Sequence, residues 1–143
     1  MRLGIAAMML VLVAACADQD PDPQPARQPT DVTLVSMTAA GGGQLGPELL
    51  PLDRKADVRR FLRPFDGRFQ GRLRKAISAY DVPEGYNLFG GVAYVGCGEP
   101  DEAAVEGEGK NAHLVPGATH DENIECFAAV TTVGLVAMPA PRQ

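Results

Sequence analysis

The 143-residue chain contains no tryptophan, and histidine and serine each occur only twice. Ser36 lies in a β-branched run and Ser78 in a helical pattern, and no G-x-S-x-G sequence places either at a nucleophile turn. A nucleophilic hydrolase needs its nucleophile beside a base, so we expect no catalytic residues and a protein that is not an enzyme. A small hydrolase that uses paired carboxylates needs no such motif and stays open as an alternative.

Spaced metal ligands are also missing. The residues that come closest to a ligand set are His113, His120, Asp121, Glu122 and Glu125. Their spacing is neither that of H-E-x-x-H nor that of an EF-hand loop. We therefore expect a solvated acidic loop, no metal and no cofactor, with weak calcium binding as the alternative.

A glycine-rich stretch, Gly41 to Gly46, matches the G-x-G-x-x-G pattern of dinucleotide-binding turns. Pro47 and Pro51 follow it closely, so the helix that such a site requires does not begin there. We expect a flexible loop. In an alternative interpretation, a small-molecule or metal-binding lipoprotein, this stretch and Gly90-Gly91 line a cleft.

No hydrophobic run is long enough to span a bilayer. The longest, Leu3 to Val13, has eleven residues, whereas a membrane-spanning helix needs about 20. It follows Arg2 and fits the hydrophobic region of a secretory signal. Val13-Ala14-Ala15-Cys16 comes next and resembles the lipobox of bacterial lipoproteins. The resemblance implies that residues 1–15 are a signal peptide and that Cys16 becomes an N-terminus bearing a diacylglyceryl anchor and palmitate.

Residues 16–30 are predicted to form a tether behind this anchor. They hold four prolines, three aspartates and no large apolar residue, so the segment has nothing with which to pack. At about 3.1 Å per residue, an extended chain of this length spans roughly 40 Å. We expect the anchor to hold the protein in the bacterial cell envelope, on the outer face of the cell membrane, where nucleic acid is not a partner. The alternatives are an ordinary signal peptide that contains a cysteine and a buried N-terminal helix.

Cysteine is scarce, and two of the three residues remain once Cys16 is lipidated. An even remainder in an exported chain predicts one disulfide, between Cys97 and Cys126. The alternative is a reactive cysteine nucleophile, which needs a base and a reducing compartment.

The rest of the chain, residues 31–143, has the length of one domain. Strands are predicted at 32–38, 88–97 and 124–138, a hairpin at 103–115 turning at 107–109, and two helices between Asp53, a candidate N-cap, and Tyr80. Gly90-Gly91 predicts a bulge or a close backbone approach. Because both faces of 124–138 are apolar, this strand is expected to be central and covered on both sides. The fold class is therefore α+β, with two helices packed on an antiparallel sheet of about 4–5 strands.

This order of elements, and the ending Val136-Ala137-Met138-Pro139, are similar to the C-terminal domain of small bacterial protease-complex-subunit lipoproteins, whose last strand closes on V-x-x-P. The Thr/Ser-Gly-Gly-Tyr turn of that family is absent, and Gly85-Tyr86 stands before the glycine-broken strand. The resemblance implies a non-catalytic interaction domain.

Charge is unevenly distributed along the domain. Nine basic residues lie between Asp53 and Lys75 against three acidic ones, and ten acidic residues follow from Asp81 onward against two basic ones. Helical spacing predicts that one solvent side carries Arg59, Arg63, Arg72 and Lys75. This candidate patch is either an ordinary solvated face or a surface for anionic lipid, an envelope polyanion or an acidic protein partner. We expect a membrane-anchored interaction or envelope-maintenance module and assign it no oligomeric state.

Overall fold

The computed structural model describes residues 31–42, 45–119 and 125–140. The predicted signal peptide, Cys16 and the tether lie outside these residues and stay predictions. The elements run in the order β1 Thr33–Thr38, β2 Leu50–Pro51, α1 Lys55–Leu62, α2 Gly67–Ala79, β3 Tyr86–Gly96, β4 Ala103–Glu106, a 3-10 turn Gly109–Asn111, β5 His113–Pro116 and β6 Val130–Pro139.

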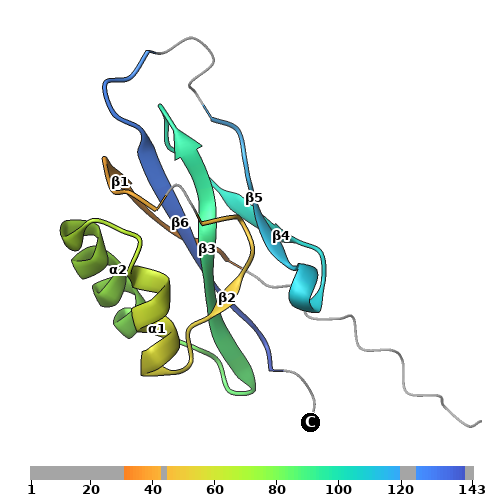
Figure 1. The fold of residues 1–143 in the computed structure, drawn as a ribbon. Helices are drawn as coiled ribbons and strands as arrows, with labels where there is room; N and C mark the ends of the chain where they lie inside the picture. The colour runs from red at the N-terminus through yellow and green to blue at the C-terminus, as the bar shows by residue number, and fades with distance from the viewer. Residues whose placement is uncertain (1–30, 43–44, 120–124, 141–143) are drawn as a thin grey trace, which may run out of the picture.

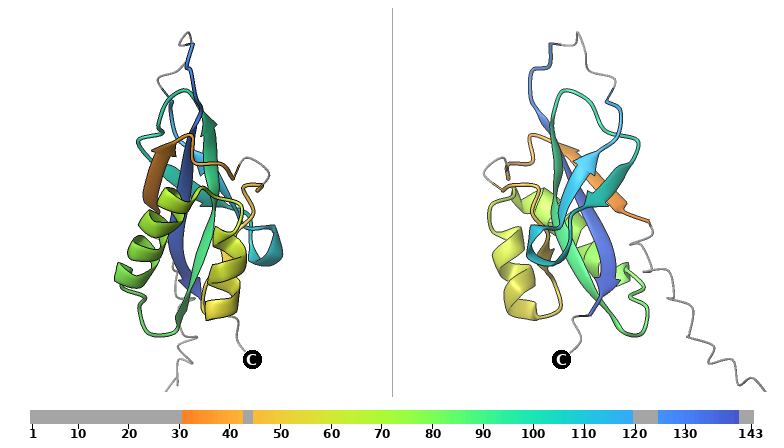
Figure 2. Two further views of the ribbon diagram at one scale, coloured as in Figure 1. Left: turned by 60° about the vertical axis from the view of Figure 1, so that its left-hand side comes forward. Right: turned by 90° about the vertical axis from the view of Figure 1, so that its right-hand side faces the viewer.

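The strands form two antiparallel sheets, and both helices pack on the larger one (Figure 1). β1, β6, β3 and β2 make a four-stranded sheet in that order, and β4 pairs with β5 in a two-stranded sheet. Both helices cover one face of the larger sheet, and the β4–β5 hairpin lies against the other face (Figures 1 and 2). The predicted α+β class, with two helices on antiparallel β-structure, is confirmed.

β6 is the central strand, as its two apolar faces predict. It pairs with β1 on one side and with β3 on the other, and residues 130–137 are all buried. Val133 and Leu135 belong to the cluster packed under the helices. Because side chains alternate along a strand, Gly134 and Val136 face the hairpin. The sheet is therefore the middle of three layers.

A cluster of three phenylalanines packs between the helices and the sheet. Phe65, in the link between α1 and α2, meets Phe61 and Phe69 edge to face, with ring centroids 5.6 Å and 5.3 Å apart. Asp66 caps α2 by accepting a 2.8 Å hydrogen bond from the backbone N–H of Arg68. These contacts hold the turn of the chain between the two helices.

The prediction that Asp53 caps α1 is wrong. Arg54 occupies the N-cap position and makes no side-chain cap. Asp53 instead accepts a hydrogen bond from the backbone N–H of Leu88 through Oδ1, at 3.2 Å. Its carboxylate therefore ties the start of the helix to β3, a long-range contact that local spacing does not reveal.

The paired glycines make a close approach rather than a bulge. Gly91 lies opposite Gly134 in the β3–β6 register, and the irregularity falls later, between Val92 and Tyr94. A Cβ atom on Gly134 would lie 2.8 Å from Cδ1 of Leu114, whose side chain is 2% exposed. Gly91 and Gly134, which face each other across β3 and β6, thus leave a space at the sheet surface that the side chain of Leu114 in β5 fills.

The predicted disulfide is confirmed. Cys97 directly follows β3, Cys126 precedes β6, and their Cα atoms are 5.4 Å apart. The strand predicted over 124–138 starts later than expected, because β6 begins at Val130 and residues 125–129 are not in a strand. The bridge therefore closes the loop that contains the whole hairpin.

Candidate functional site

The basic segment folds into the outer layer of the molecule, which we call the helix layer: α1, α2 and their flanking residues 53–80. All nine of its basic side chains are exposed. They are Arg54, Lys55, Arg59, Arg60, Arg63, Arg68, Arg72, Arg74 and Lys75. The layer therefore presents a surface that is predominantly positive.

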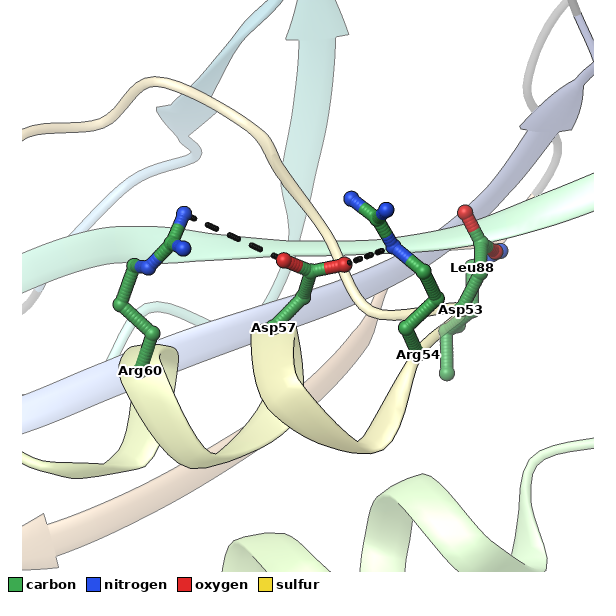
Figure 3. A network of polar contacts seen from close by, with 5 residues as sticks. All are labelled: Asp53, Arg54, Asp57, Arg60 and Leu88. Atoms are coloured by element: carbon green, nitrogen blue, oxygen red, sulfur yellow. Dashed lines mark hydrogen bonds and ion pairs between the residues drawn. The ribbon is translucent and has the colours of Figure 1, made fainter.

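Each of the three carboxylates between residues 53 and 75 accepts a hydrogen bond from another group of the domain. Asp57, only 8% exposed, accepts from Nε of Arg54 at 2.7 Å and lies 3.9 Å from Nη1 of Arg60 (Figure 3). Asp53 accepts a hydrogen bond from the backbone N–H of Leu88, and Asp66 caps α2. Within the described part of the chain, the other seven basic residues of the layer form no ion pair.

The predicted patch is on this layer and exposed. Arg59 lies in α1 and Arg63 is its C-cap, while Arg72 and Lys75 lie in α2. Nη1 of Arg72 donates to the backbone oxygen of Ser36 in β1, at 3.1 Å. This guanidinium thus reaches the edge strand of the sheet and lies at the margin of the layer. Sequence spacing could not reveal that contact, because Ser36 is 36 residues away.

Five of the acidic residues that follow Asp81 in the sequence lie with the hairpin, on the opposite side of the sheet (Figure 2). The hairpin and its approach carry exposed carboxylates with one exposed lysine, Lys110, among them. The carboxylates are Glu99, Asp101, Glu102, Glu106 and Glu108. The helix layer and the hairpin lie on opposite faces of the main sheet (Figure 2). The basic residues of the one and the carboxylates of the other are therefore separated by the sheet.

A groove of about 1160 Å³ lies between the hairpin and the main sheet. Its apolar lining comes from both, and includes Leu49, Phe89, Val105, Ala112 and Met138. Asp31, Asp101, Glu102, Glu108 and Lys110 also line it. Neither Gly90-Gly91 nor residues 41–42 line this groove; both glycines of the pair are buried in the sheet. The alternative interpretation in which the stretch 41–46 and Gly90-Gly91 line a cleft therefore does not describe this groove.

Both serine hydroxyls are bonded within the framework. Ser36 Oγ lies 2.8 Å from Thr132 Oγ1 across the sheet, and Ser78 Oγ donates to the backbone oxygen of Arg74 at 2.7 Å. His113 Nδ1 is 3.0 Å from the backbone oxygen of Asn111. No group of three metal-binding side chains occurs among the described residues. His120, Asp121 and Glu122 lie outside them.

No known protein family, curated protein or solved structure matches the chain. In the part of the chain that the structure describes, no helix has the length and apolar character to cross a membrane.

Proposed function

We propose that the protein is a lipid-anchored, extracytoplasmic interaction module whose helix layer binds an anionic polymer of the cell envelope. The single observation that carries this proposal is the charge of the helix layer. Nine exposed basic side chains stand there, and the three carboxylates between them are held by intramolecular hydrogen bonds. The lipobox-like sequence ending at Cys16 supports the anchor.

A polyanion fits this surface better than a membrane or a protein. Among the residues that the structure describes, the exposed large hydrophobic ones are Leu50, Val82, Val95 and Phe127. None of them belongs to α1 or α2. Membrane-surface helices bury an apolar face, and the hot spots of protein interfaces combine arginine with tryptophan and tyrosine. A roughly 40 Å tether also exceeds the Debye length of about 8 Å at physiological salt, which weakens attraction to lipid.

We expect the chain from Ala17 to Gln143 to bind soluble poly(glycerol phosphate) with strong salt dependence. Raising salt from 50 to 300 mM should weaken binding at least about tenfold, because each phosphate contact releases a counterion. A variant with Arg59, Arg63, Arg72 and Lys75 changed to glutamine should lose most of the affinity and of the salt dependence. Isothermal titration calorimetry measures both.

Lys75→Gln and Lys110→Gln make a matched pair of single variants. Each removes one exposed positive charge, but only Lys75 lies in the helix layer. Binding should weaken for Lys75→Gln and hold for Lys110→Gln. If the fourfold variant and the native chain bound the polymer with equal affinity, the patch would be an ordinary solvated face with no role in binding.

The anchor is tested at Cys16. The native protein should enter the detergent phase on phase partitioning, and its N-terminal peptide should carry the mass of a diacylglyceryl group on Cys16, since two acyl chains give stable membrane attachment. Cys16→Ala should remove that mass, whereas Cys97→Ser should keep it. An N-terminus without lipid, or one that begins at another residue, would reject this assignment.

A further inference from the structure

The groove beneath the hairpin has one wall made by the free edge of β4. β5 is held on both sides: it pairs with β4, and the backbone N–H of Leu114 donates to the oxygen of Pro47 at 2.9 Å. β4 has β5 as its one strand partner among the described residues. Its residues 103–105 line the groove.

Backbone alternation shows which groups this edge offers. The oxygen of Glu102 accepts from Gly117 N–H at 2.8 Å, so Glu102 faces β5. Ala103 lies opposite Pro116, which has no N–H to give. Since successive residues of a strand direct their backbone groups to alternate sides, those of Ala103 and Val105 point away from β5. Two N–H donors and two C=O acceptors are thus directed toward an added strand.

The side chains at this edge specify the chemistry of such a strand. Glu102 and Glu106 are exposed and share one face of β4, while Ala103 and Val105 are half-buried on the other face. Phe89 and Leu49, both half-buried, continue the apolar lining. A strand that pairs here meets carboxylates on one face and hydrocarbon on the other.

We propose that the groove binds an extended peptide segment of another protein, with lysine or arginine alternating with apolar residues, as an added strand on β4. Main-chain hydrogen bonds to Ala103 and Val105 supply affinity, and alternate side chains supply selectivity, as in other strand-addition complexes. Basic side chains pair with Glu102 and Glu106 across the strands. This inference is independent of the helix layer, which lies on the other face of the sheet.

Charge favours such a peptide over the chain's own N-terminal segment, although Asp31 lines the groove. Residues 17–30 carry three aspartates and one arginine, and four of the fourteen residues are prolines without an N–H. Negative charge would be placed beside Asp101, Glu102 and Glu108, and the prolines would interrupt the ladder. A basic, proline-free segment meets neither obstacle.

The test uses the full mature chain in neutral detergent and the probe acetyl-Lys-Val-Lys-Val-Lys-Val-Lys-amide. We expect saturable binding, with amide shift changes in ¹⁵N spectra confined to residues 101–110 and the groove lining. A probe with glutamate in place of lysine should not bind. A probe N-methylated on alternate residues should bind at least about tenfold more weakly, because it cannot complete the ladder.

Glu102→Gln with Glu106→Gln should weaken binding of the lysine probe about threefold to tenfold, the range of two exposed ion pairs. Asp81→Asn with Glu84→Gln is the matched control, since both residues are exposed and outside the groove lining, and it should leave the affinity unchanged. Equal binding of the N-methylated probe, shift changes outside the groove or no binding at millimolar probe would each overturn the proposal. So would at least tenfold tighter binding by a chain that starts at Asp31, because it would identify the N-terminal segment as the occupant.

Discussion

Replacing Gly134 with alanine should destabilise the domain by about 1–3 kcal/mol, the usual cost of adding volume to a packed core. A Cβ atom there would lie 2.8 Å from Cδ1 of Leu114 and 2.8 Å from Cγ1 of Val32. Both atoms are ends of side chains, but Leu114 is only 2% exposed and has little room to turn aside, so the strain should displace the hairpin on which it lies. Urea denaturation followed by circular dichroism measures the change in unfolding free energy.

A double-mutant cycle with Leu114→Ala separates this clash from a general effect of the added methyl group. Leu114→Ala alone should cost about 2–5 kcal/mol, since the side chain is 2% exposed. In the double variant the new methyl group occupies part of the vacated space. The double variant should therefore lose clearly less unfolding free energy than the sum of the two single losses. Strict additivity would show that Leu114 does not sit against Gly134.

Gly91→Ala is the matched control for the cycle. Its Cβ atom would meet the backbone oxygens of Glu48 and Pro47 at 3.0 and 3.1 Å, and Leu114 only at 3.3 Å. Backbone atoms cannot rotate away, so removal of the Leu114 side chain should rescue Gly91→Ala much less than Gly134→Ala. Equal rescue at the two glycines would contradict the described packing.

Local periodicity was sufficient to predict the helix layer. Phe61, Phe69 and Leu73 recur at helical spacing, and each is buried against the sheet. The solvent side followed from the same spacing, so the exposure of Arg59 and Arg63 was predictable. The two-sided burial of β6 was also predictable, because both sets of alternate residues are apolar and only a strand covered on both faces can bury both.

Contacts between distant segments were not predictable. Spacing shows that Gly90-Gly91 departs from an ordinary strand, but the register that places Gly91 opposite Gly134 is set by the whole β3–β6 ladder. The contact of Asp53 with Leu88 joins residues 35 positions apart, and it prevailed over the local role of a helix cap. The groove arises in the same way, since the hairpin and β6 both line it.

Charges that are separated along the sequence are also separated in the folded domain. The sequence separates basic and acidic residues along the chain. The fold places the basic helix layer on one face of the main sheet and the carboxylates of the hairpin on the other (Figure 2). Two surfaces of opposite charge are therefore present on a domain of about 110 residues.

The ion pair of Arg54 with Asp57 could be predicted from the sequence, because the two residues stand at i,i+3 spacing.

Removing the disulfide should cost about 3–4 kcal/mol of stability, because a cross-link over a sequence separation of 29 restricts the unfolded chain. Cys97→Ser with Cys126→Ser makes the change without leaving a free thiol. Urea denaturation should show the loss, and the native protein under reducing conditions should show a loss of similar size. A double variant as stable as the oxidised native protein would refute this expectation.

The loss should be uneven across the molecule. The loop that the bridge closes contains β4 and β5, which otherwise contact the sheet through Leu114 and the bonds to residues 47–49. The helix layer is anchored by its own aromatic cluster, Phe61, Phe65 and Phe69. Amide exchange in the double variant should therefore accelerate first in residues 103–116, before that of α1 and α2, because local opening follows the weakest-held unit. Equal acceleration in both layers would mean that the hairpin and the helix layer unfold as one cooperative unit.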